Sequence, residues 1–373
     1  MTENIPNRSG DPFTTDDESQ ILNTIDRWLE KDVKDKVLAL DHADEYPTQM
    51  VEQMKSLGLF GATISQRYGG LGMPSASYAK VVTAVSEVWM SLTGIFNSHL
   101  IMAAAVERFG TEEQRQRFLP KFATGEIRGG LALTEPSCGT DLQAIRTKAH
   151  KDGDHYVING AKTWISNGIQ GDCVALLVKT DTEIQPRHKG MSLFLAEKGP
   201  GFSVGPKLKK LGYKGIDSAE LFFDDYVIAA NNLIGGQEGH GFHHTVGGLE
   251  LGRINIAARG VGVANAALKA ATSYAQTRET MGKPIGQHQA IQTKLGDMAT
   301  RCHAARLLVQ DAAQAYDRGE RCDMEAGMAK LFASEAAMEN ASECMRIHGA
   351  YGYSKESHVE RYYRDAPLMC IGE

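Results

Sequence analysis

Apolar residues recur at helical spacing along the first third of the chain. The first stripe follows a candidate capping box, Thr15 to Glu18, and consists of Ile21, Ile25, Trp28, Leu29 and Val33. Between glycine-rich turns, the same period continues over residues 50–57, 77–89, 99–109 and 112–122. The pattern predicts an all-helical domain over residues 1–128.

The pattern changes at Gly129, where short strand-like runs separated by glycines, prolines and charged turns begin. These runs cover residues 156–159, 163–166, 174–179, 191–196 and 219–223. We expect a small β domain, a barrel or sandwich, over residues 129–235. Helical spacing then returns over 236–373 and predicts a helical bundle, with one apolar face formed by Ile291, Leu295, Met298, Cys302, Ala305 and Leu308. No parallel βαβ alternation occurs, so the expected class is mainly α with a β domain.

The composition limits which cellular compartment and which classes of binding partner are expected. The 373 residues and the hydrophobic fraction of 42% are enough for two or three domains with a substantial core. A net charge of −6 without a basic stripe argues against nucleic acid or an anionic membrane as partner. The six cysteines lack metal-binding spacing and fit buried thiols in a reducing compartment. The polar, acidic start is unlike a signal or transit peptide, and the apolar runs are too short for a bilayer, so a soluble cytoplasmic protein without a metal site is expected.

The densest group of candidate binding residues lies within residues 131–168. Residues 134–141, TEPSCGTD, combine hydroxyls, a proline-fixed bend and a glycine, so backbone N–H and hydroxyl groups can converge on one planar polar ligand. Residues 162–168, KTWISNG, alternate like a strand that ends in an Asn-Gly turn, and Trp164 can line a ring-shaped ligand. A hairpin with an incidental tryptophan is the alternative interpretation.

The strings LTEPSCGTD and INGAKTWISNG resemble the flavin-binding middle segment of the acyl-CoA dehydrogenase family, and the resemblance extends over nearly the whole chain. It implies a C-terminal four-helix bundle and FAD as the cofactor. Thr134 and Ser166 would hydrogen-bond the isoalloxazine, and Trp164 would pack against it and shield it. Further flavin contacts implied in this segment are Leu131, Leu133, Gly139, Ile165 and Thr140, the last reaching flavin phosphate or the CoA arm.

The resemblance places the other end of FAD against the C-terminal third. Arg278 and Gln289 would reach the pyrophosphate of FAD held by a neighbouring subunit, because a guanidinium fork suits phosphate. Neutralisation of a helix C-terminus is the simpler role for Arg278. Met281 stands at a usually aromatic position, and the glycine-rich segment with Arg346 and Gly349 resembles the turn against the adenosine. A homotetramer, a dimer of dimers, is expected.

Glu250 and Arg253 lie three residues apart at the expected start of a long helix, where a solvated ion pair is the simplest role. By resemblance they contact acyl-CoA together with Thr140. Some relatives carry the catalytic glutamate at the position of Gly252, which cannot act as a base. The resemblance instead identifies Glu373, as in members whose catalytic glutamate lies near the C-terminus. Those members continue past this residue with Gly-Thr and a further helix.

The implied reaction is FAD-dependent α,β-dehydrogenation of an acyl-CoA thioester to the trans-2-enoyl-CoA, a step of fatty acid β-oxidation. Glu373 would remove the α-proton, and flavin N5 would accept the β-hydride because no side chain can. Electrons would pass to an electron-transfer flavoprotein. Two alternatives stay open. One is another flavin enzyme on this scaffold, such as an oxidase, a nitroalkane oxidase-like enzyme or a monooxygenase; the other is a non-catalytic acyl-CoA- or flavin-binding protein. Acyl chain length and the role of Asp217 stay undetermined.

Overall fold

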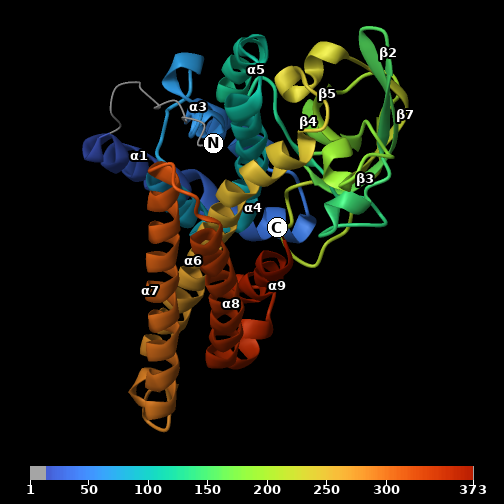
Figure 1. Ribbon diagram of the computed structural model, residues 1–373. Helices are drawn as coiled ribbons and strands as arrows, with labels where there is room; N and C mark the ends of the chain where they lie inside the picture. Colours follow the sequence, from blue (N-terminus) through green and yellow to red (C-terminus); the bar gives the residue numbers. More distant parts are fainter. Residues whose placement is uncertain (1–13, 373) are drawn as a thin grey trace.

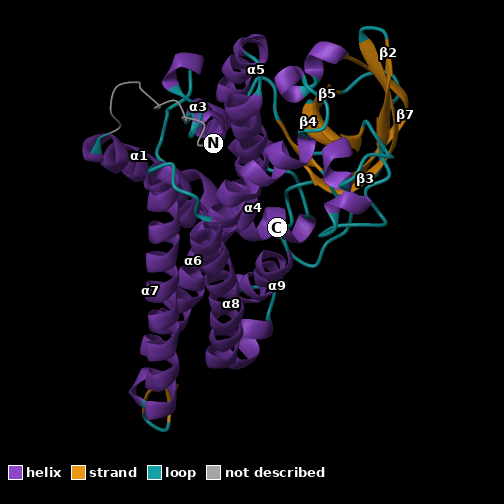
Figure 2. Cartoon of the chain, in the orientation of Figure 1, coloured by secondary structure: helices purple, strands orange, loops and turns teal. Residues whose placement is uncertain are grey.

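The computed structural model describes residues 14–372. Helices form both ends of the chain and a β domain lies between them, which confirms the predicted fold class (Figures 1 and 2). The N-terminal helices are α1 (Thr15–Trp28), α2 (Val37–Ala43), α3 (Thr48–Ser56), α4 (Ser75–Phe109) and α5 (Glu112–Thr124). The capping box of α1 is formed by Thr14 and Asp17, one residue before the predicted pair, and the predicted apolar stripe packs into the core.

Helix α4 is the central helix of the N-terminal part. The sequence predicts two helices here, and α4 is indeed interrupted by a kink at Trp89, the last residue of the first, where φ is −155° and ψ is 104°. Residues 90–98, which lie outside the predicted helices, are helical as well. Its most apolar stretch is long enough to cross a membrane by length and composition, contrary to the expectation from the sequence, yet 83% of that window is buried inside the protein. Such burial is typical of a core helix.

The β domain is one seven-stranded sheet, the half of a barrel. Its strands are β1 (Gly129–Ala132), β2 (Lys148–Asp152), β3 (His155–Ser166), β4 (Cys173–Lys179), β5 (Met191–Glu197), β6 (Phe202–Val204) and β7 (Ser218–Ala229). The order is β1-β4-β2-β3-β7-β6, with β5 paired to β4. The two strands predicted at 156–159 and 163–166 are a single strand, β3, because the irregularities between them are register shifts and not turns. Strands β1, β2 and β6 were not predicted, since they are short or mostly polar.

The C-terminal bundle contains α6 (Gly241–Thr277), α7 (Gln289–Asp317), α8 (Asp323–His348) and α9 (His358–Ile371), with the hairpin β8 (Glu279–Thr280) and β9 (Lys283–Pro284) between α6 and α7. The expectation that Glu250 opens the long helix is wrong, because α6 begins at Gly241. Gly247 does not break it: a Cβ there would come within 2.8 Å of the Phe109 ring, so glycine allows α6 and α4 to approach closely. The predicted apolar face of α7 is confirmed, with Met298 and Ala305 fully buried.

All six cysteines are free thiols. Four are buried as predicted, whereas Cys138 and Cys370 are half-buried, which corrects that part of the prediction. Cys138 lies in a tight turn at the surface of the β domain, where Glu135 and Cys138 exchange backbone hydrogen bonds.

Candidate active site

The two segments singled out in the β domain lie side by side. The backbone N–H of Thr163 donates to the carbonyl of Thr134 over 2.9 Å. The ammonium of Lys162 donates to the carbonyl of Leu133 over 3.0 Å. The hydroxyl-rich loop therefore starts directly beside the strand that carries Trp164, and the two segments form one surface.

A buried ion pair between Lys162 and Glu135 holds this loop in place. Lys162 Nζ lies 2.8 Å from Glu135 Oε1, and the two side chains are 0% and 4% exposed. The carboxylate of Glu135 also accepts from the N–H groups of Arg146 and Thr147, over 2.5 and 3.0 Å. Burial favours a raised pKa for Glu135, but Lys162 and these donors outweigh it and hold the pKa below its ordinary value. The start of the loop and the segment that follows it, at Arg146 and Thr147, are thus attached to one charged centre, which the sequence pattern did not indicate.

Trp164 stands on a bulge and not in a regular alternation. Its φ is +60°, and the register between β3 and β7 shifts between Lys162 and Ile165. The bulge leaves the indole 57% exposed beside the loop, while Ile165 is buried in the β-domain core. Ile165 therefore offers its backbone and not its side chain to any ligand on this surface. An exposed indole next to backbone and hydroxyl donors is an arrangement suited to a flat aromatic ligand.

The remaining predicted contacts of this group lie around the same surface. Leu131, Leu133, Thr134 and Ser166 are half-buried, and Gly139 and Thr140 are exposed. Strand β1 approaches the end of β3 closely, because a Cβ on Gly130 would come within 2.9 Å of the Ser166 carbonyl oxygen.

Asp217 holds the turn that follows β3, which accounts for a residue whose role the sequence left undetermined. Its Oδ2 accepts from the N–H of Ile169 over 2.7 Å, and its carbonyl accepts from the N–H of Asn167 over 3.3 Å. The Asn167 amide donates in turn to carbonyls of Ile95 on α4 and Gly129 on β1. Burial raises the pKa of Asp217. The two polar residues attach the Trp164 strand to α4 and β1.

The second predicted group gathers at the far end of the bundle. Arg278 is the C-cap of α6, Gln289 is the first residue of α7, and Met281 on the hairpin between them is 94% exposed. A surface hollow of about 260 Å³ is lined by Tyr274, Thr277, Arg278 and Tyr351. This hollow extends from Arg278 to the turn that begins at Gly349. At Gly349, φ is +58° and an added Cβ would meet no atom within 4 Å. Arg346, by contrast, is paired with Glu343 over 2.5 Å.

The two groups lie apart within one chain. Figure 1 shows the hairpin between α6 and α7 at the end of the long bundle that is remote from the β domain. Thr134 and Arg278 thus belong to two separate parts of the chain.

Glu250 and Arg253 lie in the first third of α6, and the expected ion pair between them is not formed. Within residues 14–372, neither side chain has an ion-pair partner within 4 Å. Burial, followed by a hydrogen bond with Asp323, raises the pKa of Glu250. Arg253 is half-buried nearby. The two residues thus lie where α6 faces the start of α8.

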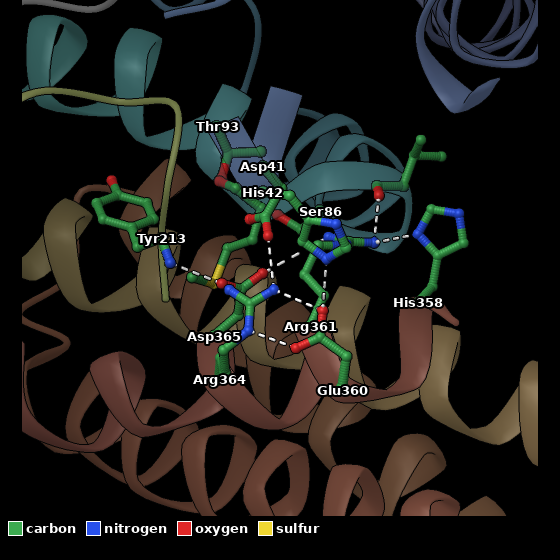
Figure 3. Close-up of polar contacts among 12 residues, drawn as sticks. Asp41, His42, Ser86, Thr93, Tyr213, His358, Glu360, Arg361, Arg364 and Asp365 are labelled. Carbon is green, nitrogen blue, oxygen red and sulfur yellow. Dashed lines mark hydrogen bonds and ion pairs between the residues drawn. The ribbon is translucent and has the colours of Figure 1, made fainter. Parts of the chain in front are cut away.

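An ion-pair network holds α9 in place (Figure 3). Arg364 donates to Asp41 over 2.6 Å and to both oxygens of Glu360, which also lies 2.9 Å from His42 Nε2. Burial favours a higher pKa for Glu360, but Arg364 and His42 lower its pKa to about 2. Asp41, His42 and Glu360 have the spacing of a metal site, yet the guanidinium of Arg364 already neutralises them.

The next residue along α9 connects it to the loop before β7. Asp365 accepts from the N–H of Tyr213 over 2.6 Å, and burial raises the pKa of Asp365 to about 6. Helix α9 leads to the end of the sequence, and Glu373 lies outside the described residues.

Comparison with known proteins identifies the family. An acyl-CoA dehydrogenase of Bacillus subtilis (strain 168) is 39% identical over 361 residues, which cover 96% of this chain and 94% of the relative. Profiles of the N-terminal, middle and C-terminal domains of acyl-CoA dehydrogenases match residues 15–126, 130–226 and 239–373. The chain belongs to the acyl-CoA dehydrogenase family. The family resemblance expected from the sequence is thereby confirmed.

Two further relatives agree with this assignment. The short-chain-specific acyl-CoA dehydrogenase of Clostridium acetobutylicum is 36% identical over 96% of this chain and 94% of the relative. The structure of butyryl-CoA dehydrogenase from Megasphaera elsdenii has a TM-score of 0.93 and 34% identity, covering 97% of this chain and 96% of that chain. The protein is an oxidoreductase of the acyl-CoA dehydrogenase type, in a family that uses FAD.

Proposed function

We propose that this protein oxidises an acyl-CoA thioester to the trans-2-enoyl-CoA, with Glu373 as the base for the α-proton, and passes the electrons to an electron-transfer flavoprotein. FAD, when bound, supplies the hydride acceptor that no side chain provides. The proposal rests on one observation. The 134–141 loop lies beside the strand that carries the exposed Trp164, and the buried Lys162–Glu135 ion pair connects the two segments.

The residues of the β domain fit an isoalloxazine. The ring needs a flat apolar neighbour and hydrogen-bond partners at its polar edge, and Trp164 lies exposed beside Thr134 and Ser166. Around them, Leu131, Leu133, Gly139 and Thr140 would contribute further contacts, and Ile165 would contribute its backbone. The buried ion pair keeps the loop rigid, so little ordering is needed when the ligand binds.

The residues for the other end of the cofactor would come from a neighbouring subunit. Arg278 faces an open hollow, and Gly349 leaves space above its backbone, so both are accessible to a phosphate or an adenosine group. Met281, Gln289 and Arg346 lie on the same end of the bundle. Because this end is remote from the β domain of its own chain, the site is complete only in an oligomer (Figure 1). A dimer of dimers is proposed.

An apolar face on α8 supports this assembly. Met324, Met328, Leu331 and Phe332 recur at helical spacing and are 67%, 45%, 64% and 38% exposed. Adjacent apolar side chains of this kind on one helix face are typical of a subunit contact.

On the substrate side, we assign contacts with the CoA moiety to Thr140, Glu250 and Arg253, and the proton transfer to Glu373. The network around Arg364 and Asp365 fixes α9, the helix that precedes Glu373 in the sequence. A carboxylate enclosed by an acyl chain should have a raised pKa, which matches it to proton transfer near neutral pH.

Anaerobic mixing of the FAD-loaded protein with butyryl-CoA tests the proposal. Loss of the yellow flavin absorbance is the expected result. Glu373→Gln should keep the bound flavin and lose reduction by about 10²- to 10⁴-fold, the usual contribution of a general base. Full turnover by this variant would remove Glu373 from the mechanism. Binding without reduction would favour a non-catalytic protein, and reduction only in the presence of another substrate class would favour a different flavin enzyme.

A further inference from the structure

We propose that the acyl group of the substrate ends in a carboxylate, and that Arg259 binds this carboxylate. The inference rests on the proposed acyl-CoA oxidation and specifies its substrate class. Its basis is a buried cation on α6 that has no counter-charge among residues 14–372, whereas Arg361, the other buried arginine of the described residues, pairs with Asp365.

Arg259 is 4% exposed and is held by neutral groups. Its Nη1 donates to the hydroxyl of Tyr213 over 3.2 Å. Its Nε and Nη2 lie 3.2 and 3.1 Å from the Asn97 amide oxygen when that amide is oriented to face the guanidinium, an orientation that also lets the amide nitrogen donate to Tyr78. Within the described part of the chain, no carboxylate forms an ion pair with Arg259.

A buried guanidinium without an anion is costly. Removal of an isolated charge from water costs several kcal/mol or more, and neutral dipoles compensate only part of that cost. The guanidinium has five N–H donors, and the contacts with Tyr213 and Asn97 use about three of them. The unused donors form the edge of a planar fork, whose best partner is a carboxylate.

Arg259 also shares one face of α6 with two further residues. Gly252, Asn255 and Arg259 are spaced i, i+3 and i+7, so they share one face of the helix. Gly252 is the position where some relatives carry their catalytic glutamate. Asn255 is 1% exposed, and neither its amide nitrogen nor its amide oxygen has a partner. Asn255, which has no hydrogen-bond partner, and Arg259, which has no partner acid among residues 14–372, thus lie on one face of α6.

Three other elements close this region around the guanidinium. Tyr213 packs against Gly94 of α4, where a Cβ would come within 1.6 Å of the Tyr213 hydroxyl oxygen. The backbone of Tyr213 is hydrogen-bonded to Asp365 of α9 (Figure 3). Arg259 therefore lies where α4, α6 and the loop before β7 meet the helix that leads to Glu373.

The helix geometry sets the length of the acyl group. Arg259 lies seven positions after Gly252, which is about 10 Å along the axis of an α-helix. Helical side chains lean toward the N-terminus, so the guanidinium reaches back toward Gly252 and shortens this span. The span suits a dicarboxylic acyl group of roughly four to six carbons.

The test compares acids with neutral acyl groups of equal length. The FAD-loaded protein is mixed anaerobically with glutaryl-CoA or pentanoyl-CoA, and with adipyl-CoA or hexanoyl-CoA. We expect kcat/KM for flavin reduction to favour the acid of each pair by about 10²-fold, because only the acid pairs with the buried cation. Equal values, or a preference for the neutral chains, would overturn the proposal and leave Arg259 with a structural role.

Two variants of Arg259 and one control variant test whether this residue causes the preference for acidic acyl groups. Arg259→Gln should reduce the acid-to-neutral ratio to about one, and Arg259→Lys should keep part of it, because the charge remains without the fork. Arg67→Gln, which removes an exposed cation of the N-terminal domain, is the matched control and should leave the ratio unchanged. An unchanged ratio in Arg259→Gln would contradict the proposal.

If the glutamine variant does not fold, Tyr213→Phe decides the question. It keeps the aromatic ring and removes the hydroxyl that positions the guanidinium, so the ratio should fall several-fold; an unchanged ratio would count against the proposal. If neither class of acyl-CoA reduces the flavin, the proposed function itself is contradicted. In that case the affinity of each acyl-CoA can still be measured from the change it causes in the flavin absorbance. We expect glutaryl-CoA to bind more tightly than pentanoyl-CoA. Equal affinities would contradict the proposal.

Discussion

Lys162 and Glu135 form a salt bridge of 2.8 Å in the interior of the β domain, between strand β3 and the loop that follows β1. The pair lies 27 residues apart in the sequence and has almost no contact with solvent. Lys162 precedes Trp164 by two residues and Glu135 follows Thr134, so the shape of the proposed flavin surface depends on a charge pair that is itself buried.

Removal of the cation should unfold the loop. Lys162→Met leaves the Glu135 carboxylate buried with only backbone donors, which typically costs about 3 to 5 kcal/mol of folding free energy. We expect a lower urea midpoint and loss of bound FAD. Lys148→Met on the neighbouring strand β2, where the lysine is exposed, is the control and should change neither quantity. A wild-type midpoint in Lys162→Met would show that the pair is dispensable.

Removal of the exposed indole should weaken flavin binding without affecting stability. Trp164 is 57% exposed, so Trp164→Ala exposes little new core, and we expect the free energy of unfolding of the FAD-free protein to change by less than about 0.5 kcal/mol. The loss of aromatic contact should weaken FAD binding about 10-fold, as measured by titration of the FAD-free protein. Val227→Ala, at the same exposed fraction on β7, should leave the affinity unchanged. Equal affinities in the two variants would exclude Trp164 from the cofactor surface.

The network on α9 should make stability sensitive to acid. The pKa of Glu360 is lowered from 4.5 to about 2 in the folded protein, so its contribution to stability is complete above pH 4.5 and is lost as the pH falls toward 2. We expect this group to account for about 2 kcal/mol of the stability lost between pH 6 and pH 3. In Glu360→Gln that part of the pH dependence should disappear, as measured by urea unfolding at both pH values. An identical acid profile in the variant would assign the loss to other groups.

The apolar face of α8 should be needed for assembly. Leu331 is 64% exposed on that face, and Leu331→Lys places a charge in the proposed subunit contact. We expect a smaller mass by light scattering and, because the proposed flavin site draws on two chains, less bound FAD per chain. Ile184→Lys alters an exposed isoleucine of the β domain and should keep the wild-type mass. A wild-type mass in Leu331→Lys would place the subunit contact elsewhere.

Local pattern was sufficient for the class of fold and for the segments that carry the proposed site. Helical periodicity is a property of neighbouring residues, so the apolar face of α7 and the order of helices, strands and helices could be predicted from the chain alone. The same holds for the 134–141 loop and for Trp164, whose residue types indicate a ring-shaped ligand. Local pattern also misled at the start of α6, which was expected near Glu250 and begins at Gly241.

Only the tertiary structure decided which distant polar residues meet. Lys162 with Glu135, Arg364 with Asp41 and Arg259 with Tyr213 are separated by 27, 323 and 46 residues, and no periodicity relates the members of such pairs. Their meeting depends on how helices and sheet pack, which is set by the shape of the whole core and not by local propensity. The sequence by itself thus determined the order of helical, β and helical parts and the family of this protein. The packing determined that Lys162 is paired with Glu135 beside the proposed flavin surface and that Arg259 is buried without a partner acid among the described residues.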